Sequence, residues 1–364
     1  MKIRSVGVHP VRLSLTHLYR DRGHTESFAE DVFVKVETDE GIVGWGATAP
    51  RTYPTGETLR ATVSILTDYL IPALIGEDPF QMEAISAKMD QVVQYNYAAK
   101  TAIDVALYDL MGKALGVPVY QLLGGCYRTE MPAFELIPLV PPEEAAGLAA
   151  KAWDEGVRSF KVKMSVQPRL DLARVEAVRR VVGEEGEVAV DANMSWTPKV
   201  AIDTVRALQD YRLYLVEQPV YYTDLDGMAL VTQMTETQIG ADESCTPGLV
   251  SELARRRGAD VFNVKLTKFG GLWRAKKVTA LAEAMGIPCI AGAVIQGSLL
   301  DAASAHFFAS TKAVVYNEAG KAPAWIREDP TSGLRVEKGM VQVPQGPGLG
   351  VKVDEGLLKK HRVE

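Results

Sequence analysis

The sequence predicts a TIM-type (β/α) barrel that follows a smaller α+β domain. Three observations predict it. Short apolar runs alternate with amphipathic stretches from about residue 130 onward, charged residues end several of these runs at a regular interval, and the first 125 residues lack this alternation. The length of 364 residues, with 47% apolar and 24% charged residues, suits a globular protein of one large or two medium domains.

Strands followed by helices are expected in the first 125 residues. The segment VFVKVETDEGIVGWGATAP, residues 32–50, holds two β-rich runs joined by Asp39-Glu40-Gly41, which favours a hairpin. Helices are then expected at residues 57–70, 79–93 and 98–116. The turn-rich stretch LLGGCYRTEMP indicates a domain boundary near residue 125.

Eight strand candidates separated by seven helices fill the second part of the chain. The strands are expected within residues 131–137, 159–164, 188–193, 213–219, 237–244, 260–266, 287–293 and 313–320. The helices are expected at 142–155 and 170–182, from about 197, 224 and 247, and at 272–285 and 298–309. The predicted domains are 1–125, 126–320 for the barrel, and a C-terminal segment over 321–364.

A charged residue ends each run from the second to the sixth. These residues are spaced 28, 26, 25 and 23 positions apart: Lys163, Asp191, Glu217, Asp242 and Lys265. Each spacing fits one strand–helix unit, and the C-terminal ends of barrel strands form active sites. The rival fold, an open doubly wound sheet, is disfavoured because no Gly-rich dinucleotide loop follows the first strand.

Three of these side chains are carboxylates that would repel one another unless a cation lay between them. For any single acid a solvated loop charge is the simpler interpretation, but recurrence at the same point of each repeat argues against it. Oxygen ligands without His or Cys favour a hard divalent ion, so Mg²⁺ is expected at Asp191, Glu217 and Asp242, and Mn²⁺ could replace it. Glu243 is expected to face the other way.

The stretch FKVKM puts Lys161 and Lys163 on the same face of a strand. Lys163 and Lys265, from the second and sixth strands, should face each other across the barrel with a substrate carboxylate between them. The positive charge of Lys161 is expected to lower the pKa of Lys163 from its usual value of about 10.4 and so make it a usable base. These parts predict removal of the proton α to a carboxylate, through an enediolate, and its return from the opposite side.

Composition excludes several other functions. A net charge of −6 argues against nucleic acid or an anionic membrane as the main partner. With no run of 18 apolar residues and no signal-peptide core at the start, a cytoplasmic protein is expected. Cys126, Cys245 and Cys289 form no CxxC pair and predict neither a disulfide framework nor a zinc site.

The motifs at the strand ends resemble the muconate-lactonizing-enzyme subgroup of the enolase superfamily. They are KVK at 161–163, DAN at 191–193, EQP at 217–219, GADES at 240–244 and NVKLTKFGG at 263–271. The segments GWGATAP at 44–50, AKTAIDVALYDLMGK at 99–113 and PVYQLLGG at 118–125 are similar to its N-terminal capping domain, and PQGPGLGV at 344–351 to its C-terminal return to that cap. The resemblance implies a modified, enolase-like barrel whose cap is completed by the C-terminal segment.

The resemblance also implies roles for individual residues. Lys163 and Lys265 match its acid/base pair, and Asp191, Glu217 and Asp242 its Mg²⁺ ligands. Lys161 matches an auxiliary lysine near the substrate carboxylate, while Asn193 and Lys268 match positions near the site, a solvated loop lysine being an equal interpretation of Lys268. None of the five histidines lies between Cys245 and Leu300, where members resembling mandelate racemase place a His base, so His306 is expected to be a packed or surface residue.

Within this subgroup the lysine pair supports several reactions, and loops near residues 16–28 and 47–57 and the end of the eighth strand should decide among them. That end, YNEAGKAPAW at 316–325, lacks the Asp-x-Asp pair of dipeptide epimerases. The general layout, including YNEAG at 316–320 and the PQGPGLG tail at 344–350, is more similar to racemases and epimerases of proline-derived amino acids or betaines. We therefore expect Tyr53 and Trp325 to hold a substrate ammonium by cation–π contact, with Glu318 as counter-charge, although packing is the simpler role for Trp325.

The leading hypothesis is a Mg²⁺-dependent racemase or epimerase of an amino-acid derivative that is N-modified, proline-like or a dipeptide. The alternatives are a muconate cycloisomerase or a lyase of the o-succinylbenzoate synthase type. A further hypothesis, from another functional class, is a non-catalytic metal-binding barrel used for assembly. The expected partner is a small-molecule carboxylate, and the resemblance implies a homo-oligomer.

Overall fold

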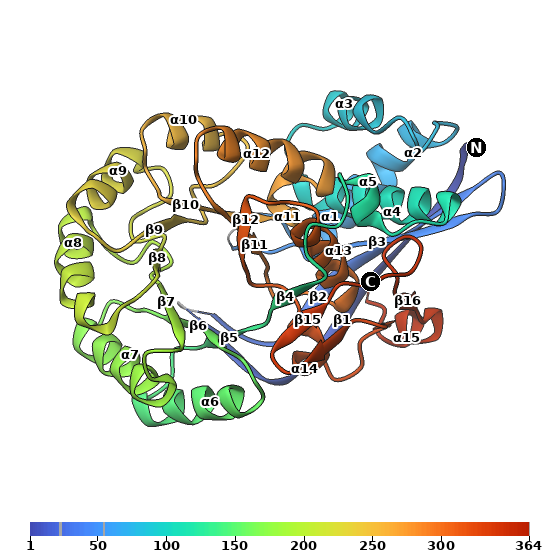
Figure 1. Ribbon diagram of the computed structural model, residues 1–364. Coiled ribbons are helices and arrows are strands. Elements are labelled where there is room, and N and C mark those ends of the chain that lie inside the picture. Colours follow the sequence, from blue (N-terminus) through green and yellow to red (C-terminus); the bar gives the residue numbers. More distant parts are fainter. Residues whose placement is uncertain (22–23, 54, 364) are drawn as a thin grey trace.

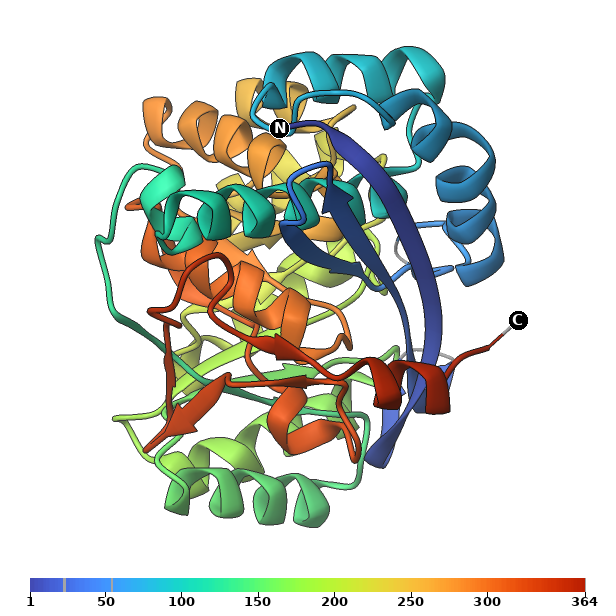
Figure 2. The same ribbon diagram turned by 90° about the vertical axis from the view of Figure 1, so that its right-hand side faces the viewer.

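The computed structural model describes residues 1–21, 24–53 and 55–363 (Figures 1 and 2). An antiparallel sheet with its own helices lies beside a barrel of eight parallel strands, so the predicted fold class is confirmed. Among the described helices, none has the length and apolarity needed to cross a bilayer.

The N-terminal sheet contains β1 (Ile3–Asp21), β2 (His24–Thr38) and β3 (Val43–Thr48) in that order. The expected hairpin joins β2 to β3, with Gly41 in its turn at a φ of 80°. The expected loop at 16–28 is instead largely strand, because β1 and β2 continue to pair as far as Tyr19 opposite Glu26 and beyond. Residues 22 and 23 of that range lie outside the described residues, as does residue 54 of the expected loop at 47–57.

Helices cover this sheet, and they lie close to the positions predicted from the sequence. They are α1 (Leu59–Ser64), the π-helical turn η1 (Ile65–Leu70), α2 (Ile71–Leu74), α3 (Met82–Val92), α4 (Tyr97–Leu115) and α5 (Val119–Leu122). The first three form one continuous run that begins at Thr58, whose side chain accepts a hydrogen bond of 3.2 Å from the amide of Ala61. Helix α4 ends at Gly116, which has a φ of 71°.

Helix α4 packs directly on β3, and two glycines make this close approach possible. A Cβ atom on Gly46 would lie 2.1 Å from the carbonyl oxygen of Ala102, and one on Gly44 would lie 2.2 Å from that of Ala106. Both neighbours are backbone atoms in the middle of a buried helix, so they cannot move aside as a flexible side chain would. The two glycines therefore fix how near α4 lies to the sheet.

All eight predicted barrel strands are present. They are β5 (Phe134–Ile137), β6 (Ser159–Lys163), β7 (Glu187–Asp191), β8 (Leu215–Glu217), β9 (Ile239–Ala241), β10 (Val261–Lys265), β11 (Cys289–Gly292) and β12 (Val314–Asn317). They pair in parallel in chain order, each with its neighbours in sequence. The carboxyl ends of all eight therefore point to the same end of the barrel.

Helices between the strands form the outer layer (Figure 1). They are α6 (Pro142–Asp154), α7 (Pro168–Val182), α8 (Pro198–Ala207), α9 (Leu225–Met234), α10 (Val250–Arg255), α12 (Leu272–Ala284) and α13 (Ser298–Ala309). Two short turns were not expected, η2 (Gln209–Tyr211) and α11 (Leu266–Phe269). The second of these begins immediately after Lys265 and carries Lys268 back toward the strand ends.

The C-terminal segment contains α14 (Ala322–Trp325), β13 (Thr331–Ser332), β14 (Arg335–Glu337), β15 (Met340–Gln342), β16 (Lys352–Val353) and α15 (Glu355–Lys360). β15 pairs with β4 (Glu130–Pro132), which lies just before the barrel. Single bridges join Val11 to Arg362 and Leu15 to Ile326, and Figure 2 shows α15 beside β1. The segment thus contacts both the barrel and the N-terminal domain.

We predict that Gly46→Ala lowers the free energy of unfolding by at least about 2 kcal/mol, because the added methyl group forces α4 away from β3. Chemical denaturation measures the change. Gly147→Ala is the matched control: Gly147 lies exposed in α6 with open space around its Cβ position, so alanine there should stabilise the protein by about 0.5–1 kcal/mol. Equal effects of the two substitutions would contradict the close approach.

Candidate active site

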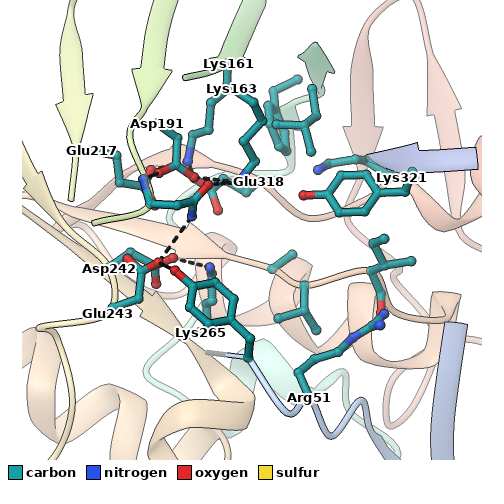
Figure 3. A pocket seen from close by; sticks show the side chains of 18 of the residues that line it. Arg51, Lys161, Lys163, Asp191, Glu217, Asp242, Glu243, Lys265, Glu318 and Lys321 are labelled. Atoms are coloured by element: carbon teal, nitrogen blue, oxygen red, sulfur yellow. Dashed lines mark hydrogen bonds and ion pairs between the residues drawn. The ribbon is translucent and has the colours of Figure 1, made fainter. Parts of the chain in front are cut away.

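The charged residues predicted at the strand ends meet in one cavity of about 90 Å³ (Figure 3). Strand pairing sets Lys163 opposite Asp191, and Asp191 opposite Glu217. Asp242 follows directly after β9, and Lys265 ends β10. Since the barrel brings these ends together, residues spread over about a hundred positions share one buried space.

The N-terminal domain supplies the other wall of the cavity. Tyr19 at the end of β1, Glu26 of β2, and Arg51 and Tyr53 after β3 all line it. Arg51 is fixed by Glu26, 2.6 Å away, and by a hydrogen bond of 2.5 Å to the carbonyl of Ile295 on the barrel. The cavity is therefore formed between two parts of the chain.

Lys163 lies against the acid of the neighbouring strand. Its Nζ donates to Asp191 Oδ2 at 2.7 Å and to Asn193 Oδ1 at 2.8 Å. The amide of Asn193 in turn donates to Asp191 Oδ1 at 2.9 Å, and Asn193 has a positive φ of 41°. The end of β7 and the turn after it thus hold these two oxygen partners of Lys163 in place.

Lys161 contacts Glu217 and Glu318, so its charge is neutralised by two buried carboxylates. Burial alone would lower the pKa of Lys161, but Glu217, Glu318 and Asp191 outweigh burial and raise it well above its usual value. The charge that Lys161 brings beside Lys163 is therefore paired with acids, and its expected lowering of the pKa of Lys163 stays a prediction. Glu318, which follows β12, was not recognised from the sequence as its partner.

Lys265 contacts Asp242 from the far side of the cavity. Lys268 approaches the same carboxylate from α11, at 2.5 Å from Oδ1, and does not line the cavity. Burial favours protonation of Asp242, but the two ammonium groups outweigh it and lower its pKa. Lys268 is buried, so the interpretation of it as a solvated loop lysine is wrong.

Glu243 faces the cavity, and the expectation that it faces away is wrong. β9 ends at Ala241, so the alternation of strand side chains no longer applies two residues later. Glu243 Oε1 accepts hydrogen bonds from Tyr53 Oη at 2.6 Å and Asn193 Nδ2 at 3.2 Å. Burial, together with Asp242 and Asp191, raises the pKa of Glu243 to about 7.

The buried acids that line the cavity have the chemistry of a divalent-metal site. Burial raises the pKa of Glu217 well above its usual value, Lys161 opposes this, and Glu318 and Asp191 add to it. Oε2 of Glu243 is buried without a hydrogen-bond partner in the described structure. Within the described ranges no three His, Cys, Asp or Glu side chains converge on one point, because each acid is turned toward a lysine. The oxygen-only donor set nevertheless fits a hard cation.

Three residues expected to bind substrate lie in different surroundings. Tyr53 and Glu318 line the cavity. Trp325 lies in α14, outside the residues that line it, and its ring stands 5.0 Å from the Nζ of Lys321. A cation of the chain itself therefore occupies one face of Trp325.

Three further residues of the site, Arg51, Lys321 and Asn263, are not among those predicted from the sequence. Asn263 donates to Glu217 Oε1 at 2.9 Å and to Glu318 at 3.1 Å. It precedes Lys265 by two positions on β10, so strand alternation could have identified it. No local pattern indicated Arg51 or Lys321, because both lie outside the regular strands. His306 is buried in α13 and bonded at 3.1 Å to the carbonyl of Leu349, as expected of a packed histidine.

Comparison with known families covers nearly the whole chain. Residues 4–124 match the mandelate racemase / muconate lactonizing enzyme N-terminal domain. Residues 144–357 match the enolase C-terminal domain-like family. These matches agree with the resemblance of the strand-end motifs.

Relatives of several activities span the full length. A hydrophobic dipeptide epimerase of Enterococcus faecalis is 35% identical over 354 residues, which cover 96% of this chain and 99% of that protein. An N-succinyl-L-Arg/Lys racemase of Bacillus cereus is 33% identical over 362 residues, covering 99% and 98%. A muconate cycloisomerase 1 of Rhodococcus opacus is 33% identical over 337 residues, 90% of each chain.

Solved structures of two of these proteins are similar to this one. The B. cereus racemase superimposes with a TM-score of 0.97, covering 100% of this chain and 99% of that one. A dipeptide epimerase from E. faecalis, complexed with Mg and the dipeptide L-Leu-L-Tyr, superimposes with a TM-score of 0.92 at 35% identity, covering 97% and 100%. These relatives are isomerases, so the alternative of a non-catalytic barrel is wrong. The chain belongs to the mandelate racemase/muconate lactonizing enzyme family of the enolase superfamily and is an isomerase.

Proposed function

We propose that this enzyme racemises or epimerises an amino-acid derivative by removing the proton α to its carboxylate and returning one to the opposite face. The observation that carries the proposal is the placement of Lys163 and Lys265. β6 and β10 are separated by three strands on one side of the eight-stranded barrel, so the two amines approach the cavity from opposing sides. A substrate held between them would present one face to each.

Different side chains of this protein would carry out the separate steps of the reaction. A neutral Lys163 or Lys265 would take the α-proton, and the ammonium of the other would deliver a proton to the far face. Asn193 would orient Lys163 through its hydrogen bond of 2.8 Å. Lys161 would lie near the substrate carboxylate, and Lys268 would hold the carboxylate of Asp242 in place.

Asp191, Glu217 and Asp242 would hold Mg²⁺. The bound ion would supply positive charge that stabilises the enediolate and lowers the pKa of the adjacent lysines. The acids suit this role because they lie on adjacent strand ends and are buried. The Mg in the structure of the E. faecalis relative supports the same assignment.

Among amino-acid derivatives, an N-acylated one fits the cavity best. Glu318, the carboxylate expected to pair with a substrate ammonium, is already engaged by Lys161 and Asn263. Lys321 adds a cation to the cavity, which would repel a quaternary or secondary ammonium. An acylated nitrogen carries no charge and avoids both costs.

Muconate cycloisomerisation is the second candidate, favoured by the relative from R. opacus, and it can use a single lysine as base. A racemase exchanges the α-proton with deuterium oxide from either enantiomer. We expect such exchange with N-acyl amino acids, followed by proton NMR in deuterium oxide with Mg²⁺ present. Loss of muconate absorbance, with no exchange from either enantiomer, would instead establish the second candidate.

We predict that Lys163→Ala and Lys265→Ala each lower racemisation about 10²- to 10⁴-fold, because each removes the acid/base group on one face. Each variant should retain exchange from one enantiomer only, and the two variants should retain opposite ones. Lys199→Ala, an exposed residue of α8, is the control and should leave both rates unchanged. Retention of the same enantiomer by both variants would contradict the opposed arrangement; thermal melting confirms that each variant is folded.

Metal binding can be measured without catalysis. We predict one Mg²⁺ site per chain by titration calorimetry, with Mn²⁺ competing for it, and at least a tenfold loss of affinity in Glu217→Gln because the amide supplies no negative charge. Glu187→Gln, at the opposite end of the neighbouring strand β7, should bind Mg²⁺ as the natural chain does. Unchanged affinity in Glu217→Gln would remove this residue from the metal site.

A further inference from the structure

The barrel helix α12 begins without a capping side chain of its own. Its N-cap residue is Gly271, although the first amides of a helix have no partner within the helix. Asp104, in the middle of α4, supplies that partner from the N-terminal domain. Its Oδ1 accepts a hydrogen bond of 2.5 Å from the amide of Leu272, and its Oδ2 accepts one of 3.3 Å from the amide of Trp273. The helix is therefore capped by a carboxylate that lies 168 residues away along the chain.

This contact requires both a glycine and an acid. Gly271 has a φ of 105°, and a Cβ atom there would lie 2.2 Å from Oδ1 of Asp104, so no other residue could take its place without displacing the carboxylate. Burial raises the pKa of Asp104 to about 7, and the amides of Leu272 and Trp273 oppose this. A carboxylate nevertheless offers one acceptor oxygen to each amide, whereas an asparagine side chain has only one.

The capped helix follows directly on the turn that carries two lysines of the site. Lys265 ends β10, and Lys268 lies in α11, which begins at the next residue. Lys265 contacts the carboxylate of Asp242 (Figure 3), and Lys268 approaches the same carboxylate from α11. Gly270-Gly271 is the whole connection between α11 and α12, so a shift at the start of α12 moves this turn as well.

A second contact from α4 reaches the beginning of the same turn. Thr101 Oγ1 lies 3.0 Å from the carbonyl oxygen of Leu266, the first residue of α11. It also lies 2.8 Å from the carbonyl oxygen of Tyr97 within α4, so its one proton is shared between the two. Thr101 and Asp104 are both buried and lie three positions apart, on one face of the helix. This face of α4 therefore holds the turn at both of its ends.

We propose that Asp104 is a positioning residue for Lys265: it fixes the turn that carries this lysine, although it belongs to the other domain and does not line the cavity. Lys163 is held separately, by Asp191 and Asn193 at the end of β7 and in the turn after it. Asp104 should therefore affect proton transfer on one face of the substrate only. The inference rests on the proposed function, since it takes Lys265 as the acid/base group on that face.

The test measures α-proton exchange in deuterium oxide from each enantiomer of N-acetyl-leucine with the Mg²⁺-loaded enzyme. We expect Asp104→Ala to lower kcat about 10- to 100-fold for the enantiomer that Lys265→Ala fails to exchange, because a small displacement of the amine disrupts proton transfer. Exchange from the opposite enantiomer, and KM for both, should change by less than about threefold, because the groups that bind substrate stay in place. Asp104→Asn keeps one acceptor oxygen and should show the same selective loss, but a smaller one.

Asp354→Ala is the matched control. Asp354 caps the exposed helix α15, where its Oδ1 accepts from the amides of Gly356 at 2.8 Å and Leu357 at 3.1 Å. Loss of this cap should lower the free energy of unfolding by about 1 kcal/mol and leave both exchange rates unchanged. The comparison separates the loss of a helix cap from the loss of lysine positioning, and thermal melting confirms that each variant is folded.

An equal loss of exchange from both enantiomers in the folded Asp104 variants, or no loss from either, would overturn the inference and leave the proposed function intact. If the natural enzyme exchanges neither enantiomer, the proposed function fails, and amide hydrogen exchange read by mass spectrometry decides the inference. Faster amide exchange over residues 265–273 in Asp104→Asn, with residues 159–163 unchanged, would support the anchoring of the turn. Unchanged amide exchange over residues 265–273 would overturn it.

Discussion

The neutralisation of buried carboxylates by buried ammonium groups is the constraint on which the centre of this protein depends. Asp191 and Glu217 end two adjacent strands and Asp242 directly follows the next one. All three are buried, so their mutual repulsion would be destabilising without cations. The lysines that relieve it come from strands on either side of the three acids. The same arrangement that makes the acids tolerable in the core places two amines across a cavity from each other.

The N-terminal domain closes this arrangement and ties it to the barrel. Arg51 bonds to the carbonyl of Ile295, and the buried Asp31 accepts a hydrogen bond of 2.7 Å from the amide of Gly297. The C-terminal segment adds a further link, because Arg327 donates to the carbonyl of Leu15 at 2.9 Å. Placement of Tyr53 over the acids therefore depends on contacts between segments distant in sequence. Most charged residues of the cavity belong to the barrel, whereas the N-terminal domain supplies its other wall.

Sequence reasoning succeeded where a residue belonged to a repeated unit and failed where the repeat ended. Lys163, Asp191, Glu217 and Lys265 are the last residues of regular strands, so their common location followed from the spacing alone. For Glu243 the expected alternation of side chains does not hold, because β9 ends at Ala241. The stretch at 16–28 is expected to be a loop, but among the described residues Tyr19 to Asp21 pair with His24 to Glu26 across the hairpin.

The sequence by itself determined the barrel, the order of its strands and the set of charged residues at their ends, because these follow from local periodicity and spacing. Only the tertiary structure decided which charges are paired. Lys161 lies between Glu217 and Glu318, which are separated by about a hundred residues, and Lys321 faces the cavity without an acid in contact within the described residues. Ion pairing depends on distances of a few ångströms between separate segments, and no pattern within one segment encodes such distances.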